Sequence, residues 1–320
     1  MNQHNTHVAI PGTGLKVTRL GLGTGPLGGM YTSVSDQESD ELIESAFDNG
    51  INFFDTAPFY GLGTAEVRLG RALKKSKKAF VLETKVGRAL VPATDTGTTI
   101  FEDADPTVET VFDFSAKAIK RSIEESLNRL QVERIDLVLL HDAENHVSQA
   151  IHEAYPVLDE YRRLGKISGV GIGMTHCAAS IHIMQKCDLD LVLIAGRYTL
   201  LDQEAQNELF PLAIQKKVSV LAAGVYNSGI LANPISGARY DYAPATPEIL
   251  AKAVKIQAFL RERHVSLTAA AIQFPLQHPA VTGVIAGARN KAELQENIKD
   301  FNSDIPLTVW EDLRSARLIS

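Results

Sequence analysis

The stretch INFFDTAPFYG, residues 51–61, carries the pattern that decides the fold. An apolar run that suits a buried strand ends at Asp55, and Tyr60 follows in the loop beyond it. The same pattern recurs twice further along the chain, where apolar runs lead into Lys85 and into His141. Because the carboxyl ends of parallel strands meet at one face of a barrel, we expect these four side chains to converge there.

These four side chains form a chemical unit. A tyrosine is a weak acid with an ordinary pKa near ~10, and a buried lysine or histidine beside it can shift that value toward working pH. Asp55 can hold Lys85 charged and in place. Taken singly, each residue has an ordinary explanation as a turn cap, a loop aromatic, an exposed lysine or a core histidine. Together they can pass a proton to or from an oxygen while another centre moves a hydride.

Strand and helix patterns alternate along the chain. Eight short apolar runs suit strands that are buried on both faces, with helical patterns between them. Eight alternations without a linker or composition break favour an α/β protein, a single (β/α)8 barrel domain over residues 1–320, rather than a two-domain doubly wound enzyme. The predicted strands are Arg19–Gly23, Ile51–Asp55, Phe80–Lys85, Ile135–His141, Ile167–Gly173, Leu189–Gly196, Val218–Ala223 and Val281–Ala286.

Several helix starts and one loop can also be predicted. Ser35 opens a helix with Glu38 three residues on, which is a capping-box pattern. Ser115 can cap a later helix, and Thr246 stands before a proline that suits a first helical position. The irregular segment 233–244 follows the seventh strand, so we expect it to lie over the active-site face.

Residues 23–28, GTGPLG, match the dinucleotide-binding fingerprint G-x-G-x-x-G letter for letter. A Rossmann site requires a helix to open within that loop, and no helical period starts before Ser35. The match is therefore better explained by a flexible loop at the top of the first strand, close to whatever the barrel binds.

Composition restricts the partners. The chain has 320 residues and a net charge of -6 without a basic block, so nucleic acid is not an expected partner. The N-terminus lacks signal-peptide features and no apolar run approaches ~18 residues, which predicts a cytoplasmic protein without membrane contact. Cys177 and Cys187 are ten residues apart in one helix-like stretch, about 15 Å, too far for a disulfide, and no metal motif is present.

The chain resembles the aldo-keto reductase superfamily over nearly its whole length. The resemblance implies an eight-stranded barrel that holds a nicotinamide dinucleotide in an extended form, without a Rossmann domain. It also implies a catalytic tetrad of Asp55, Tyr60, Lys85 and His141. The segments that carry it are 21–24, 50–61, 66–70, 84–85 and 126–130, with Asp136.

The chain departs from the family at the nicotinamide pocket. Many members hold the carboxamide with a Ser-Asn pair after the fifth strand and a Gln on the sixth. This chain has GIGM at 171–174 and AGRY at 195–198, so other residues must make those contacts. The resemblance implies cofactor contacts at Gly23, Thr24, Asp55, Ser228, Gly287, Ala288, Arg289, Glu293, Glu296 and Asn297.

The loop after the eighth strand bears on the choice between NAD and NADP. NADP-using relatives have a Lys-Ser pair at the place of 287–288 and an arginine at the place of Glu293. A carboxylate there repels a 2′-phosphate and can accept from ribose hydroxyls, which predicts NAD. Arg289 and Lys291 lie nearby as phosphate contacts, so NADP stays open. Alternatively, Asn290 and Glu293 form a capping box at the start of a helix, and both interpretations of Glu293 can hold together.

Segments 197–201 and 225–231 resemble one subgroup, which contains aldose 1-dehydrogenases for L-fucose, L-galactose and D-threo-aldoses and a pyridoxal 4-dehydrogenase. The resemblance implies an NAD-dependent oxidoreductase that converts a cyclic hemiacetal sugar to a lactone. Tyr60 would accept the anomeric hydroxyl proton, and Lys85 would lower the Tyr60 pKa. Pyridoxal, also a hemiacetal, is the first alternative substrate. A non-catalytic cofactor-binding subunit is the second alternative. The oligomeric state is open.

Overall fold

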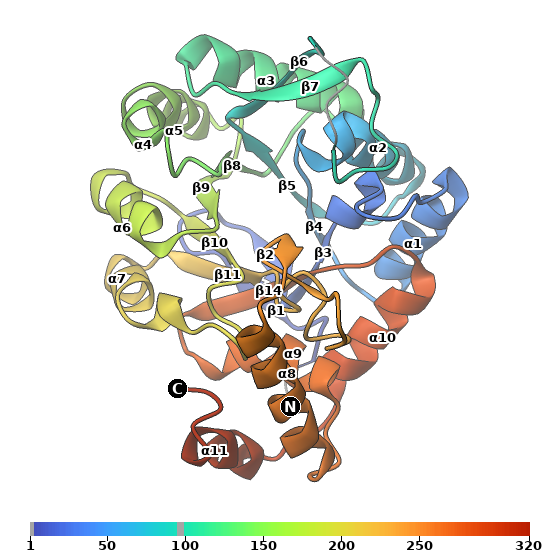
Figure 1. The fold of residues 1–320 in the computed structure, drawn as a ribbon. Helices are drawn as coiled ribbons and strands as arrows, with labels where there is room; N and C mark the ends of the chain where they lie inside the picture. Colours follow the sequence, from blue (N-terminus) through green and yellow to red (C-terminus); the bar gives the residue numbers. More distant parts are fainter. Residues whose placement is uncertain (1–2, 95–98) are drawn as a thin grey trace.

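The computed structural model describes residues 3–94 and 99–320, and its centre is a closed barrel of eight parallel strands (Figure 1). Each predicted strand is confirmed, with ends that agree within two residues. In barrel order, the strands are β3 (Leu20–Gly23), β4 (Phe53–Asp55), β5 (Val81–Val86), β8 (Leu137–His141), β9 (Gly169–Met174), β10 (Leu191–Ala195), β11 (Ser219–Ala223) and β14 (Val281–Gly287).

Helices surround the barrel and connect its strands (Figure 1). The Ser35 capping box is present, and the Ser115 and Thr246 side chains cap their helices as predicted. The α-helices are α1 (Asp36–Asp48), α2 (Thr64–Lys75), α3 (Ala116–Leu130), α4 (Val147–Gln149), α5 (Tyr155–Arg163), α6 (Cys177–Lys186), α7 (Leu209–Lys216), α8 (Pro247–Arg261), α9 (Leu267–Gln273), α10 (Lys291–Asn302) and α11 (Leu307–Ser315). The short helices are η1 (Gly25–Gly28), η2 (Tyr60–Gly63), η3 (Ala150–Ala154), η4 (Glu204–Gln206) and η5 (Phe274–Gln277).

Successive side chains along each strand point to opposite faces, which creates two separate apolar cores. One set of positions, such as Leu82 and Val138, packs against the helices in the larger core. The other set points into the barrel, where Phe53, Val81 and Leu137 belong to a smaller cluster. Asp55, Lys85 and His141 share the parity of this inner set, so the strands direct all three side chains into the barrel.

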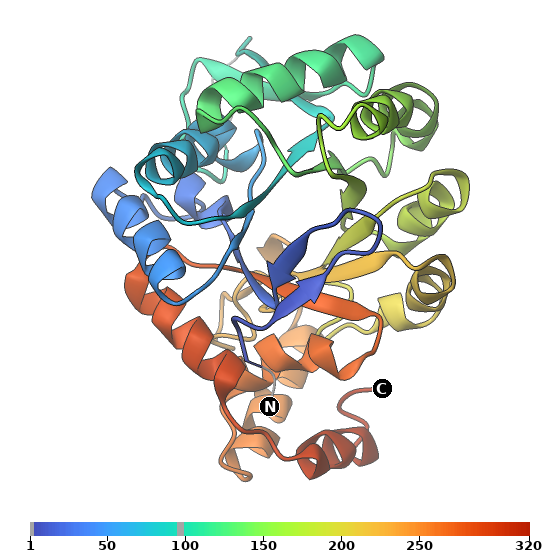
Figure 2. The same cartoon turned by 180° about the vertical axis from the view of Figure 1, so that it is seen from behind.

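An N-terminal hairpin closes the end of the barrel opposite the strand ends that carry the tetrad. Strands β1 (His7–Ala9) and β2 (Lys16–Thr18) pair antiparallel, and Figure 2 shows the hairpin lying across the barrel from behind. Its Ile10 and Val17 join the inner apolar cluster, so the barrel interior is sealed from that side.

Two small sheets lie outside the barrel. Strands β6 (Arg88–Pro92) and β7 (Val108–Phe112) form an antiparallel hairpin directly after β5. Strands β12 (Arg239–Tyr240) and β13 (Ala243–Pro244) form a two-residue pair inside the segment that was predicted as an irregular loop. That segment contributes Tyr242 to the wall of the cavity at the tetrad, which confirms its predicted position.

The glycine-rich loop does not open an α-helix. Residues 25–28 form the short 3-10 helix η1, and α1 begins only at Asp36. Gly28 is required by packing, because a Cβ there would lie 2.4 Å from the backbone nitrogen of Gly61. The G-x-G-x-x-G match therefore reflects close contact between two loops, and not a Rossmann site.

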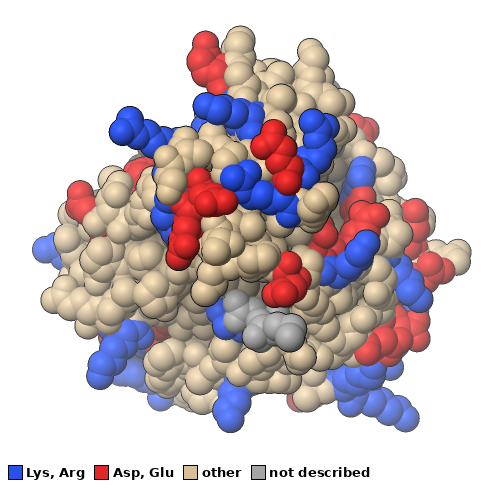
Figure 3. All heavy atoms as spheres, turned by 90° about the horizontal axis from the view of Figure 1, so that it is seen from below, with Lys and Arg blue, Asp and Glu red and all other residues tan. Residues whose placement is uncertain are grey.

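Acidic and basic side chains are interspersed over the face in Figure 3, without an extended region of one sign. None of the helices in residues 3–94 and 99–320 has the length and apolar character that a membrane crossing needs. Cys177 and Cys187 are buried and free.

Candidate active site

The structure brings Asp55, Lys85 and Tyr60 together at the cavity end of β4 and β5. The Lys85 ammonium donates to the Asp55 carboxylate, to the backbone oxygen of Thr56 at 3.0 Å and to the Tyr60 hydroxyl at 3.1 Å. Lys85 is 1% exposed, so these three acceptors replace its water. The convergence that was predicted from the strand ends is therefore present in the structure.

The loop that carries Tyr60 is held by close backbone packing. Tyr60 begins the short helix η2, and Gly61 and Leu62 follow it with φ of 63° and 51°. Only a few residue types adopt this left-handed region easily, and glycine does so at least cost. Contact between Gly28 and Gly61 then fixes the loop against η1. The two glycines thus set the place of the phenol at the cavity floor.

His141 faces the same point from β8. Its ring lies 5.9 Å from the Tyr60 ring and nearly perpendicular to it. Burial lowers the pKa of His141 well below its usual value, and the positive charges of Lys85 and Arg88 lower it further. The imidazole is therefore neutral at pH 7, with one nitrogen able to donate and one able to accept. Its Nδ1 has no hydrogen-bond partner among the described residues.

The electrostatics of Tyr60 differ from the expectation. Burial raises the pKa of the Tyr60 phenol, and the nearby Lys85 charge opposes this without reversing it. Burial also favours a neutral Lys85, but Asp55 and Tyr60 outweigh it and the pKa of Lys85 is raised. The lysine acts in the expected direction, yet the prediction of a tyrosine pKa below its ordinary value is wrong for this structure. Desolvation is the larger effect, and a sequence does not display it.

A cavity of about 780 Å³ opens above the tetrad. Its wall includes most residues that the resemblance implied for cofactor binding: Gly23, Asp55, Ser228, Gly287, Ala288, Arg289 and Glu293. Three others do not line it. Thr24 is fully buried, and Glu296 is exposed on α10. Asn297 is engaged within the fold, because it accepts from the Tyr226 hydroxyl at 2.8 Å and donates to the Gly287 oxygen at 3.1 Å.

The start of α10 combines a helix cap with an ion pair. The Asn290 side chain accepts from the Glu293 backbone nitrogen at 3.1 Å. The Glu293 carboxylate accepts from the Arg289 backbone nitrogen and guanidinium, both at 2.8 Å, instead of returning to Asn290. The expected reciprocal capping box is therefore wrong, although the Asn290 cap is present. Arg289 and Glu293 line the cavity as an ion pair, so a guanidinium that can bind an anion lies directly beside a carboxylate.

The cavity also has residues that the sequence analysis missed. The Arg88 guanidinium donates to Asp142 at 2.7 Å and stacks 3.3 Å above the Phe59 ring. All three residues line the cavity together with Tyr31 and Tyr242. A signal existed for Asp142, which directly follows His141 at a strand end. Arg88 begins the β6–β7 hairpin, and no sequence pattern indicated that this hairpin borders the site.

Asn227 is a further missed residue. It lies on the cavity wall, is 3% exposed and has a positive φ of 44°. Its amide nitrogen donates to the Gly196 oxygen at 3.3 Å, while its Oδ1 has no partner among the described residues. A buried acceptor without a donor costs free energy. The wall at this point therefore fits a ligand that brings an N–H or O–H group, such as a carboxamide.

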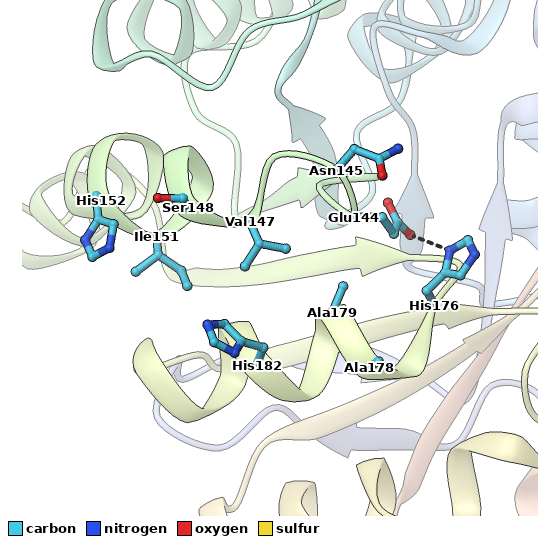
Figure 4. Close-up of a pocket in the computed structure, with 10 residues that line it drawn as sticks. All are labelled: Glu144, Asn145, Val147, Ser148, Ile151, His152, His176, Ala178, Ala179 and His182. Atoms are coloured by element: carbon cyan, nitrogen blue, oxygen red, sulfur yellow. Dashed lines mark hydrogen bonds and ion pairs between the residues drawn. The ribbon is translucent and has the colours of Figure 1, made fainter.

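A second hollow of about 770 Å³ lies away from the tetrad, between α6 and the helices α4 and η3 (Figure 4). His176 approaches Glu144 at 3.4 Å at one end, and His152 and His182 lie toward the other end. Within residues 3–94 and 99–320, no group of three or more His, Cys, Asp or Glu side chains could hold a metal ion. The hollow has no tetrad residue, so the chemistry belongs to the other cavity.

Comparisons with known proteins agree with this geometry. The sequence model of the Aldo/keto reductase family matches residues 19–317. A pyridoxal 4-dehydrogenase from Microbacterium luteolum is 39% identical, over 98% of this chain and 97% of its own. A D-threo-aldose 1-dehydrogenase from Pseudomonas sp is 39% identical, over 98% of each chain. The holo form of an aldo-keto reductase from Bacillus halodurans superposes with a TM-score of 0.80 at 25% identity, covering 99% of this chain and 97% of that one. The chain therefore belongs to the aldo/keto reductase family of oxidoreductases, which use a nicotinamide cofactor.

Proposed function

We propose that the protein oxidises the anomeric carbon of a cyclic hemiacetal aldose to a lactone, with NAD as the oxidant. The observation that carries this proposal is the 3.1 Å contact between the Lys85 ammonium and the Tyr60 hydroxyl, with neutral His141 beside it at the cavity floor. The 39% identity to a D-threo-aldose 1-dehydrogenase supports the same reaction.

Each tetrad residue has a distinct part in the proposal. When bound, the nicotinamide supplies the acceptor for the hydride that leaves the sugar C1. The Tyr60 oxygen takes the proton of the anomeric hydroxyl, and the Lys85 charge stabilises the phenolate that must form first. Asp55 keeps Lys85 protonated. His141 is neutral, so it can donate to the sugar oxygen without adding a charge to the cavity.

The cofactor assignment rests on Glu293 and Asn227. Glu293 lines the cavity with its charge directed at Arg289, so a 2′-phosphate would compete with an existing ion pair. Ribose hydroxyls would instead donate to the carboxylate. The Asn227 Oδ1, which has no partner among the described residues, would accept from the nicotinamide carboxamide, in place of the Ser-Asn pair and Gln that this chain lacks. We infer NAD as the preferred cofactor, held by these two side chains among others.

Pyridoxal is the second candidate substrate. It also forms a cyclic hemiacetal, and the same transfer of hydride and proton would give its lactone. A pyridoxal 4-dehydrogenase is as similar to this chain as the aldose enzyme is, at 39% identity. The cavity wall includes Phe59, Tyr31 and Tyr242, and aromatic faces suit a flat pyridine ring.

A substrate panel tests the proposal. The purified protein is incubated with NAD and, in turn, with L-fucose, L-galactose, D-threo-aldoses and pyridoxal, and NADH is followed by absorbance. Turnover of an aldose, with lactone as the product, is the expected result. Turnover of pyridoxal alone would support the second candidate. Binding of NAD without turnover of any of these compounds would contradict both, and would favour a cofactor-binding subunit.

A further inference from the structure

Glu83 is a buried carboxyl group that the proposed mechanism does not use. It lies on β5 two residues before Lys85, so both side chains point into the barrel. In the parallel pairing of β4 and β5 it stands opposite Asp55, and its carboxyl group is within hydrogen-bonding reach of the Asp55 carboxyl. Glu83 has no exposed surface, and neither of its carboxyl oxygens accepts a hydrogen bond from a donor among the described residues.

Among residues 3–94 and 99–320, the groups around Glu83 offer it no cation of its own. Asp55 faces it from β4, Lys85 follows it on β5, and the β8 residue opposite is Leu137. His141 stands at the cavity end of β8 and is neutral. The remaining inner positions are mainly glycines and the apolar side chains of the inner cluster, which include Phe53. Lys85 is already bound to Asp55 and to the oxygens of Thr56 and Tyr60.

Charge balance determines whether Glu83 is protonated. Two adjacent carboxylates with one ammonium would leave an uncompensated negative charge in a dry interior, which is strongly unfavourable. Two carboxylates also cannot hydrogen-bond to each other, because neither has a proton to donate. One added proton removes the excess charge and supplies the missing donor at the same time.

We propose that Glu83 is a neutral carboxylic acid whose O–H donates to the Asp55 carboxylate, and that it thereby acts as a positioning residue for Lys85 and Tyr60. The role in catalysis rests on the proposed function, whereas the protonation state does not. Burial and the adjacent Asp55 charge raise the pKa of Glu83 well above its usual value, in agreement with this state. This hydrogen bond holds the Asp55 carboxylate in its contact with the Lys85 ammonium, which in turn donates to the Tyr60 hydroxyl.

Infrared spectroscopy tests the protonation state directly. At pH 7 the wild type should show the carbonyl band of a protonated carboxyl group, and Glu83→Gln should lack it. Glu66→Gln is the matched control, because Glu66 is equally buried but accepts from Arg129 and Thr84, both at 2.7 Å. The control should retain the band. A wild-type spectrum without the band, or a band that persists in Glu83→Gln, would overturn the proposal.

Thermal unfolding as a function of pH gives an independent test. Above the ordinary glutamate pKa, the unfolded chain releases the Glu83 proton and the folded chain keeps it, so the wild type loses stability as pH rises. Glu83→Gln has no such proton. The difference between its Tm and the wild-type Tm should therefore rise by about 2 °C per pH unit between pH 5 and 7. A Tm difference that is independent of pH would refute a protonated Glu83.

The positioning role needs a comparison of two variants. Glu83→Gln keeps a neutral donor, so the pH profile of kcat/KM should match the wild type within about 0.3 units. Glu83→Leu removes the donor, and the acid limb should move upward by about one unit. Equal profiles in all three proteins would refute the role while leaving the proposed function intact. If the leucine variant does not fold, an altered profile in Glu83→Gln would still refute the role, and a retained profile would support it.

Discussion

Replacement of Lys85 by methionine should move the pH dependence of the reaction far to alkaline values. The substitution removes the ammonium that lies 3.1 Å from the Tyr60 hydroxyl and keeps an unbranched side chain in its place. Tyr60 must become a phenolate before it can accept a proton from the substrate. Burial already raises its pKa, and the Lys85 charge is the main opposing effect. Removing that charge leaves desolvation unopposed.

The magnitude follows from the distance. Two unit charges 3.1 Å apart interact by about 5 kcal/mol at an effective dielectric constant of about 20. One pKa unit corresponds to about 1.4 kcal/mol, so the loss amounts to about four units. The acid limb of kcat/KM for sugar oxidation should then leave the measurable range. At pH 8 the rate should fall at least about 10³-fold, within the range that general base catalysis contributes.

The assay is steady-state NADH formation between pH 6 and 11 with the aldose that gives turnover. Lys85→Arg is the control, since it keeps a cation in the same place, and its acid limb should stay within the measured range. Fluorescence quenching by NADH would show whether the methionine variant still binds cofactor. A slow methionine variant whose acid limb coincides with that of the wild type would refute the argument that Lys85 tunes Tyr60.

Three further substitutions test other parts of the site. Tyr60→Phe should reduce kcat about 10²–10⁴-fold with cofactor affinity nearly unchanged, because it removes only the proton acceptor; kcat and the Kd for NADH check this. Glu293→Arg should shift the ratio of kcat/KM from NAD toward NADP, because a guanidinium replaces the carboxylate that pairs with Arg289. Gly28→Ala should lower the free energy of unfolding by about 1–3 kcal/mol in urea titrations, because its Cβ would meet the Gly61 nitrogen at 2.4 Å.

Each of these has its own control. Retention of more than about a tenth of the wild-type rate in Tyr60→Phe would exclude the assigned role. Glu293→Gln separates loss of the charge from gain of the cation, and an unchanged cofactor ratio in both variants would reduce Glu293 to a structural partner of Arg289. Gly25→Ala lies in the same loop, and its Cβ would meet nothing closer than 3.4 Å. Equal stability of the two alanine variants would argue against the backbone contact.

The barrel and the convergence of the four side chains could be predicted from sequence because both follow local patterns. A strand buried on both faces is a continuous apolar run, and a polar residue at its end, such as Asp55 or His141, marks the open face. Asn227 and Arg88 had no such mark, because their importance depends on which loops meet across the barrel. The β6–β7 hairpin and the partner of Glu293 likewise depend on tertiary contacts. The pKa of Tyr60 depends on desolvation, which exists only after folding.

The charges of the four site residues balance in the free protein. Asp55 and Lys85 supply one negative and one positive charge in direct contact. Tyr60 and His141 are neutral at pH 7, because burial disfavours their charged forms. With Glu83 protonated, the net charge of these groups is zero. An ionised Glu83 would add a second negative charge near Tyr60, which would make the phenol still harder to deprotonate. The proposed neutral Glu83, opposite Asp55 on the neighbouring strand, would therefore affect the step at Tyr60 without contacting substrate or cofactor.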